Sequence, residues 1–107
     1  MPNSYTNAKV DLTATSATTL YTTPAATTAL VKSILVSEDS GNADTITVTI
    51  TDADAAVFSL FKVKAVASNT TVELLSEPLV VKENEILKVT AATANRLHVV
   101  ASLLEIS

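Results

Sequence analysis

The chain has 107 residues and no cysteine, which favours one domain and excludes a disulfide framework or a thiolate metal site. Apolar residues make up 48% of the chain and charged residues only 17%, so it is not a disordered chain of the charged kind. The net charge of −4 argues against a surface that binds nucleic acid or an anionic membrane.

The N-terminal region carries neither a secretory signal nor a membrane-spanning segment. Met1–Asn7 lacks a basic residue, which a signal sequence needs at its start. Leu12–Val31 is uncharged but consists mostly of Thr, Ala and Ser, and is too polar to span a bilayer. We therefore expect a soluble protein made in a cytoplasm, with a single domain over residues 1–107 and residues 1–7 as a possible N-terminal arm.

The rest of the chain is typical of β-structure. Seventeen Thr and thirteen Val, both β-branched, account for 30 of the 107 residues and favour strands over helices. Apolar and polar residues alternate most clearly in Thr45–Thr51, which reads TITVTIT. In chain order the predicted strands are Ala8–Thr13, Thr19–Thr22, Ala29–Ser37, Thr45–Thr51, Val57–Val66, Thr71–Leu75, Leu79–Lys82, Ile86–Ala91 and Arg96–Ile106. Their close spacing predicts an all-β fold, an antiparallel β-sandwich or jelly-roll-like domain of eight or nine strands.

The segments between these strands are rich in Asp, Asn and Glu, and contain the single glycine, Gly41. With so little glycine, we expect Asn42, Asn69 and Asn95 to take the left-handed conformation that tight turns need. Two acidic pairs flank turns, Asp39 with Asp44 and Asp52 with Asp54. A Ca²⁺ site is conceivable there, but the twelve-residue pattern of a calcium loop is absent, and solvated turns are the favoured interpretation. We predict no metal and no other cofactor.

The sequence offers no constellation of catalytic residues. His98 is the single histidine and has no cysteine or second histidine to share a zinc ion with; we interpret it as a strand residue at an interface or a sheet face. Lys62 and Lys64 alternate along one strand and are interpreted as a solvated face or as protection of a sheet edge. We therefore predict that the protein is not an enzyme.

Two strands are apolar on both faces, which a sandwich with one wet face does not require. Ala29–Val36 places Leu30, Ile34 and Val36 on one side and Val31 and Leu35 on the other. The last strand doubles in the same way, and Arg96 at its start suits an ion pair between subunits. These strands predict a homo-oligomer. The predicted interface residues are Leu30, Ile34, Val36, Arg96, Val100, Leu104 and Ile106.

Most of the chain, from about Thr18 onward, resembles a known group. The run LYTTPA over residues 20–25, followed by TTALVKSILV over residues 27–36, is similar to small virion proteins of tailed bacteriophages. A loop such as Ser40–Asp44, a Thr/Val strand, Glu77–Val80 and the closing strand fit the same group, which often has more glycine in its loop.

The resemblance implies a β-sandwich part of a virion, with the homo-oligomer, the major capsid protein or other virion proteins as its partners. Capsid decoration, or cement, is the role we favour, which would place the protein in the virion after synthesis in the host cytoplasm. A tail, neck or fibre component is the first alternative. A carbohydrate-binding sandwich module is a weaker one, because the chain has no Trp to form a sugar platform.

Overall fold

The structure is a computed structural model that describes residues 3–107. This part of the chain forms nine strands and no helix, so it has no helix that could cross a membrane. In order, the strands are β1 (Asn3–Asp11), β2 (Thr18–Thr22), β3 (Thr28–Glu38), β4 (Asp44–Thr51), β5 (Val57–Val66), β6 (Thr71–Glu73), β7 (Leu79–Val81), β8 (Ile86–Ala91) and β9 (Leu97–Ile106).

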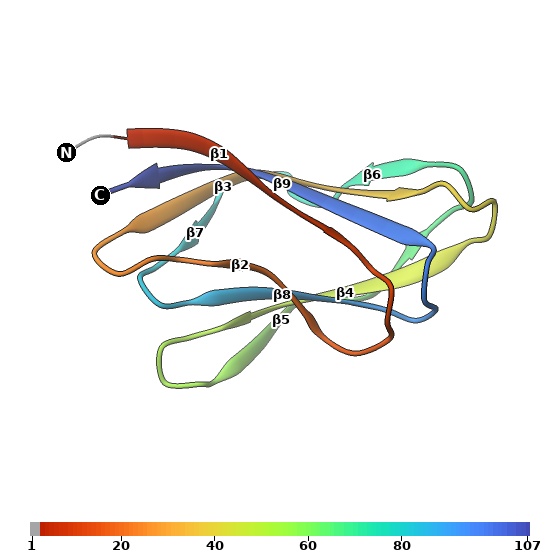
Figure 1. Cartoon of the computed structure of the whole chain (residues 1–107), viewed down its shortest axis with the longest axis horizontal. Helices are drawn as coiled ribbons and strands as arrows, with labels where there is room; N and C mark the ends of the chain where they lie inside the picture. Colours follow the sequence, from red (N-terminus) through yellow and green to blue (C-terminus); the bar gives the residue numbers. More distant parts are fainter. Residues whose placement is uncertain (1–2) are drawn as a thin grey trace.

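The strands pack as two antiparallel sheets, one above the other in Figure 1. Sheet A has the order β1-β9-β3-β6, with β7 also paired to β3, and sheet B has the order β2-β8-β4-β5. The pairing is nested: β4 pairs with β5, β3 with β6 and β7, β2 with β8, and β1 with β9. Two sheets built from such nested pairs make a jelly roll in which β6 and β7 share one strand position. The all-β sandwich prediction is confirmed.

The predicted strands all occur; Val57–Val66 and Ile86–Ala91 have the predicted bounds, and the others differ by one to five residues at one or both ends. The largest shift is at the N-terminus, where β1 begins at Asn3 and pairs along its whole length with β9. The described part of the expected arm, residues 3–7, is thus an edge strand of the chain's own sheet; residues 1–2 lie outside the described residues. Its backbone is held by antiparallel pairing, which the side-chain pattern of a polar edge strand does not reveal.

The core lies between the inner faces of the two sheets, where alternate residues of the central strands are fully buried. Strands β4, β8 and β9 follow strict alternation, with Ile46, Val48, Leu87, Val99 and Leu103 buried. In β4, Thr side chains occupy the other face, as the TITVTIT pattern predicts. Burial of this apolar area is the main stabilising contribution to a domain of this kind.

Strand β3 departs from strict alternation because of a bulge in its pairing with β9 between Val31 and Ser33. A bulge adds one residue to one strand and so reverses which side chains face inward. Val31 is buried before the bulge, and Ile34 and Val36 are buried after it. Leu30 and Leu35 therefore share the outer face, although the sequence pattern places Leu30 with Ile34 and Val36.

The turns use asparagine and alanine where glycine is scarce. Asn69 and Asn95 have φ of 54° and 66°, as predicted, whereas Asn42 does not have positive φ and its neighbour Gly41 does. Asn84, Ala26 and Ala55 adopt the same left-handed region. Val63, within β5, has a φ of 53°, a strained conformation for a β-branched residue.

Candidate interaction surface

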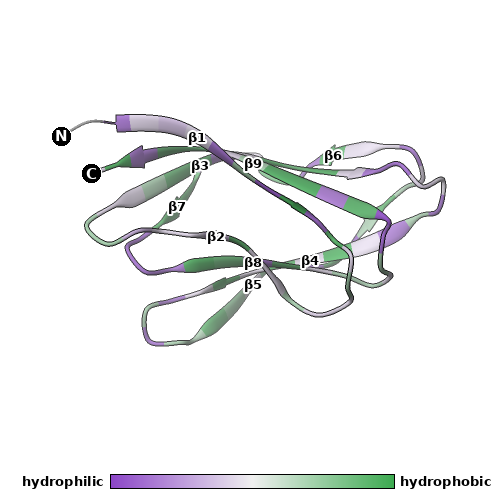
Figure 2. Ribbon diagram, viewed as in Figure 1, coloured by the Kyte–Doolittle hydropathy of each residue, from purple (hydrophilic) through white to green (hydrophobic). Residues whose placement is uncertain are grey.

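The outer face of sheet A carries an exposed group of apolar side chains. One row crosses four strands, with Val80 of β7 beside Leu30, Leu30 beside Leu104, and Leu104 beside Tyr5. A second row places Leu35 beside Val100. Figure 2 shows the hydrophobic residues along β3 and β9. We call this group the outer patch; its members are Tyr5, Leu30, Leu35, Val80, Val100, Leu104 and Ile106.

Members of the outer patch are solvent-exposed to an extent unusual for large apolar side chains. Val80 is 52% exposed, Ile106 42% and Leu35 39%. Tyr5 at the edge is 76% exposed, and the Lys32 ammonium lies 5.8 Å from its ring centroid, a cation–π contact. Leu30 and Leu104 are half-buried, and Ser102 lies between the two rows on β9, paired with Ser33 and Asn7. Grouped apolar side chains on a surface mark an interaction site more often than isolated ones do.

The structure places the predicted interface residues in three different environments. Leu30, Val100, Leu104 and Ile106 lie on the outer patch. Ile34 and Val36 are 0% exposed and belong to the core, because the bulge in β3 turns them inward, so a surface of the folded chain does not include them.

Arg96 lies in the turn before β9, where its guanidinium donates a hydrogen bond of 2.9 Å to the carbonyl of Ala43. It joins two turns of the same chain instead of extending the outer patch. Tyr5, Leu35 and Val80 are patch members outside the seven predicted interface residues, although Leu35 was named on one apolar face of Ala29–Val36. Tyr5 belongs to the expected N-terminal arm, and its pairing with β9 brings it to the patch.

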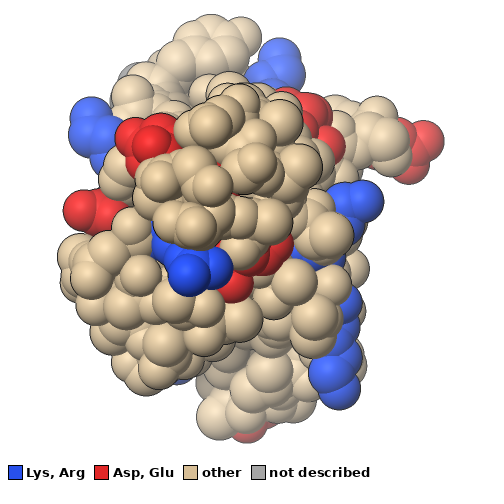
Figure 3. Space-filling view, turned by 90° about the vertical axis from the view of Figure 1, so that its right-hand side faces the viewer, with Lys and Arg blue, Asp and Glu red and all other residues tan. Residues whose placement is uncertain are grey.

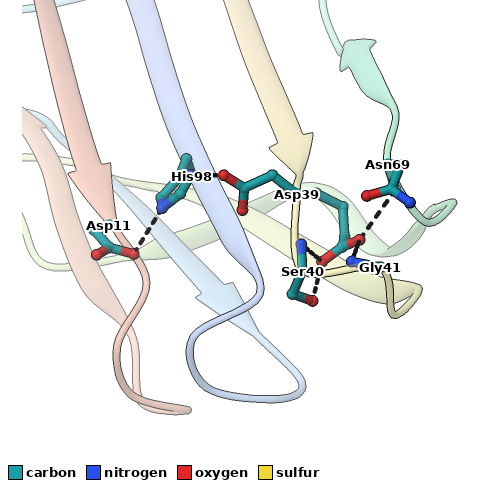
Figure 4. Close-up of polar contacts among 7 residues, drawn as sticks. Asp11, Asp39, Ser40, Gly41, Asn69 and His98 are labelled. Atoms are coloured by element: carbon teal, nitrogen blue, oxygen red, sulfur yellow. Dashed lines mark hydrogen bonds and ion pairs between the residues drawn. The ribbon is translucent and has the colours of Figure 1, made fainter.

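At one end of sheet A, His98 lies between two carboxylates. Figure 4 shows it flanked by Asp11, at the end of β1, and Asp39, just after β3. The His98 Nε2 atom is 3.2 Å from Asp11 Oδ1, and Nδ1 is 3.5 Å from Asp39 Oδ2. All three side chains are well exposed, so the pairing contributes little to stability. His98 is thus a residue on a sheet face, one of the two places expected for it.

Glu38, at the end of β3, is a buried carboxylate that organises two turns. Its Oε1 atom accepts hydrogen bonds of 3.1 Å from the backbone N–H groups of Gly41, Asn42 and Asn69. Its Oε2 atom accepts from the Ser40 N–H at 2.8 Å and from the Ser40 hydroxyl. Burial raises the pKa of Glu38, but the hydrogen bonds from Ser40, Asn69 and Gly41 outweigh it and lower the pKa to about 2.

Two more acidic residues, Asp44 and Asp52, also accept hydrogen bonds from backbone N–H groups. Asp44 accepts from the N–H groups of Thr45 and Thr93, and the Oδ1 atom of Asp52 accepts from those of Asp54 and Ala56. No group of three or more His, Asp or Glu residues in positions 3–107 could hold a metal ion. In these turns the carboxylates bind backbone N–H groups, a role that sequence spacing cannot separate from metal binding.

A part-buried hydrogen bond joins the two sheets near the opposite end. The Tyr21 hydroxyl of β2 donates to Glu105 Oε2 of β9 at 2.5 Å. Burial, together with this carboxylate, raises the pKa of Tyr21 well above its usual value. The contact explains why a charged residue is tolerated on the inward-facing side of β9.

Acidic and basic side chains are scattered among uncharged ones on the end of the molecule drawn in Figure 3. That end is therefore neither uniformly acidic nor uniformly basic. A phosphate backbone requires a clustered basic surface, which this end lacks.

Comparison with known proteins yields a likeness of fold alone. No protein-family model matches the chain, and no curated protein gives a significant match. The chain is similar to two crystal structures of a pentameric capsid protein isolated from metagenomic phage sequences. The first has 20% sequence identity and a TM-score of 0.47, over 94% of this chain and 58% of that chain. The second has 21% identity and a TM-score of 0.45, over 94% and 60%. The chain spans about three fifths of the length of either structure.

Proposed function

We propose that the chain is a non-enzymatic structural protein of a bacteriophage virion and that it decorates, or cements, the capsid as a homo-oligomer. The outer patch is the observation that carries this proposal, because it leaves several large apolar side chains in water on one sheet face. A protein that acts alone gains nothing from such a surface, whereas an assembly component buries it against its neighbour.

The size of the face fits a specific contact. The molecule measures 44 × 26 × 22 Å along its principal axes, and sheet A forms one long side of it in Figure 1. A side 44 Å long and 22 Å wide offers about 970 Å² of projected area, against about 800 Å² per partner in a standard interface. Many copies attached in this way stabilise a shell through multivalency, even where each contact is weak.

The test is a binding measurement on particles of the phage that carries this gene. Purified wild-type chain is expected to bind particles that lack it, and copies counted by mass spectrometry should match the number of equivalent sites on the shell. Leu104→Lys, at the centre of the outer patch, should abolish binding. Thr15→Lys, which adds the same charge at an exposed residue between β1 and β2, should leave binding intact.

Two outcomes would refute this proposal and favour one of the alternatives. Copies confined to the tail axis would assign the chain to a tail, neck or fibre. Binding on a glycan array, undiminished by Leu104→Lys, would favour the carbohydrate-binding alternative.

A further inference from the structure

Each of the two sheets has two edges within residues 3–107, and three of these edges carry features that oppose the addition of a further strand. At one edge of sheet A, β6 and β7 are only three residues long and are separated by a segment that contains Pro78. In sheet B, the pairing of β2 with β8 is irregular between Thr19 and Tyr21. The pairing of β5 with β4 is also irregular, and Val63 of β5 is left-handed. Short strands, breaks and bulges of this kind keep an edge from pairing.

The remaining edge strand, β1, has none of these features. It runs over nine residues, Asn3–Asp11, and each of them pairs with a residue of β9 without a shift in register. It contains neither proline nor glycine. In Figure 1 it lies at the top of the molecule, and its outer side has no paired strand within the described residues. A long and regular edge is a surface to which a further strand can pair.

The backbone hydrogen bonds at the end of β1 indicate which of its groups face outward. The Leu12 N–H donates to the Leu97 carbonyl at 3.0 Å, and the Leu12 carbonyl accepts from the Asn95 N–H at 2.8 Å. Because this direction alternates along an antiparallel strand, every second residue before Leu12 also faces β9. The other residues of β1 direct both backbone groups away from β9, and their side chains lie on the outer face of sheet A. They are Asn3, Tyr5, Asn7, Lys9 and Asp11.

We propose that a second copy of this chain is the partner of β1, and that the two strands pair antiparallel about a two-fold axis at Asn7. Asn7 is the midpoint of Asn3–Asp11, so this register alone pairs the strand over its whole length. It also brings outward-facing residues opposite outward-facing residues, and each such pair exchanges two hydrogen bonds. The two Asn7 residues form the central pair.

The side chains of β1 suit a second copy in this register. The single cation of the strand, Lys9, lies opposite Tyr5 of the second copy, and an ammonium group beside an aromatic ring is a favourable contact. Tyr5 is 76% exposed in one chain, which leaves room for this contact beside that with Lys32. The single anion, Asp11, lies opposite Asn3. A pairing centred on Lys9 would instead place two ammonium groups opposite each other, which is destabilising.

This pairing joins the two copies of sheet A into one continuous sheet. The two-fold axis is perpendicular to the sheet, so the two outer patches lie on the same face, on either side of the paired β1 strands. One dimer then presents two patches to a shell together, which strengthens attachment through multivalency. That consequence rests on the proposed function, whereas the pairing itself concerns the purified chain alone.

A cysteine cross-link tests the register, because the chain has no cysteine of its own. Asn7→Cys places two thiols at the two-fold axis, where directly opposite residues have Cα atoms within the range of a disulfide. We expect this variant to form a covalent dimer under mild oxidation. Asn3→Cys is the matched control, since Asn3 is also an exposed asparagine of β1 but lies opposite Asp11, and it should remain largely monomeric. Equal cross-linking of the two variants, or none in Asn7→Cys, would overturn the proposal.

A proline tests the backbone pairing without disturbing the fold of one chain. The Asn7 N–H faces away from β9, so Asn7→Pro removes a donor that is not part of the β1–β9 pairing, and an edge strand tolerates proline there. Dimerisation in sedimentation measurements should weaken at least about tenfold, because symmetry removes two hydrogen bonds. Asn7→Ala keeps the N–H and should dimerise like the wild type. Circular dichroism checks that both variants fold.

The outcomes separate a second copy from other partners. A wild-type chain that stays monomeric at submillimolar concentration, or an Asn7→Pro variant that dimerises like the wild type, would refute the proposal. A monomeric wild-type chain whose binding to particles is abolished by Asn7→Pro would refute it too, and would assign this edge to a strand of another virion protein. Failure to bind particles with dimerisation intact would count against the proposed function only.

Discussion

The bulge in β3 predicts opposite consequences for two adjacent residues, Ile34 and Leu35. Ile34 is 0% exposed between the sheets, whereas Leu35 is 39% exposed on the outer patch. Truncating a fully buried isoleucine to alanine costs about 2–5 kcal/mol, since a cavity remains in the core. Truncating Leu35 removes apolar area that is already partly in water, at a cost of about 1 kcal/mol.

These costs translate into clearly different melting temperatures. For a domain of about 100 residues, 1 kcal/mol corresponds to roughly 4 °C in Tm. Ile34→Ala should therefore melt about 8–20 °C below the wild type. Leu35→Ala should melt only about 4 °C below it. The assay is thermal unfolding followed by circular dichroism, at a concentration low enough that contacts between copies do not contribute.

A second pair of residues, on the other side of the bulge, tests the change of face itself. Val31→Ala should destabilise the chain more than Leu30→Ala, although the leucine loses more carbon atoms, because Val31 is buried and Leu30 is not. If Leu30→Ala destabilised the chain as much as Ile34→Ala, and Val31→Ala had little effect, Leu30 and Ile34 would both face the core. The bulge, and with it the outer patch, would then be refuted.

Three further predictions concern turns and polar contacts. The pKa of Glu38 is about 2 in the folded chain, below its ordinary value of 4.5, so its stabilising effect is complete above about pH 4.5 and is lost as the pH falls through about 2. The Tm difference between wild type and Glu38→Gln should accordingly be largest near neutral pH and close towards pH 2; a difference that is constant with pH would contradict this assignment. Tyr21→Phe should cost roughly 1–2 kcal/mol in urea unfolding, through loss of the hydrogen bond to Glu105, and Glu105→Gln should lower the pKa of Tyr21, measured by ultraviolet titration. Val63→Asn should stabilise the chain by roughly 1 kcal/mol by relieving left-handed strain, whereas Val57→Asn, equally exposed on the same strand, should not; equal effects would mean that Val63 is not strained.

Local pattern was enough to predict the strands, since alternation of side chains along an extended chain depends only on neighbouring residues. TITVTIT in β4 predicted both the strand and its alternate burial, and the apolar residues of β9 predicted the strand. The lack of helices in residues 3–107 and the use of Asn69 and Asn95 in turns followed from composition in the same way.

The tertiary structure decided which side chains of β3 are buried. The bulge arises from how β3 pairs with β9, residues about 70 positions apart, and one added residue reverses the faces without any mark in the sequence. In the same way, residues 3–7 become a strand because β9 is beside them, and Glu38 becomes a buried turn organiser because Asn69 comes within reach. Side-chain periodicity is a property of one strand, whereas register, edge exposure and hydrogen-bond partners belong to pairs of strands that only the folded chain brings together.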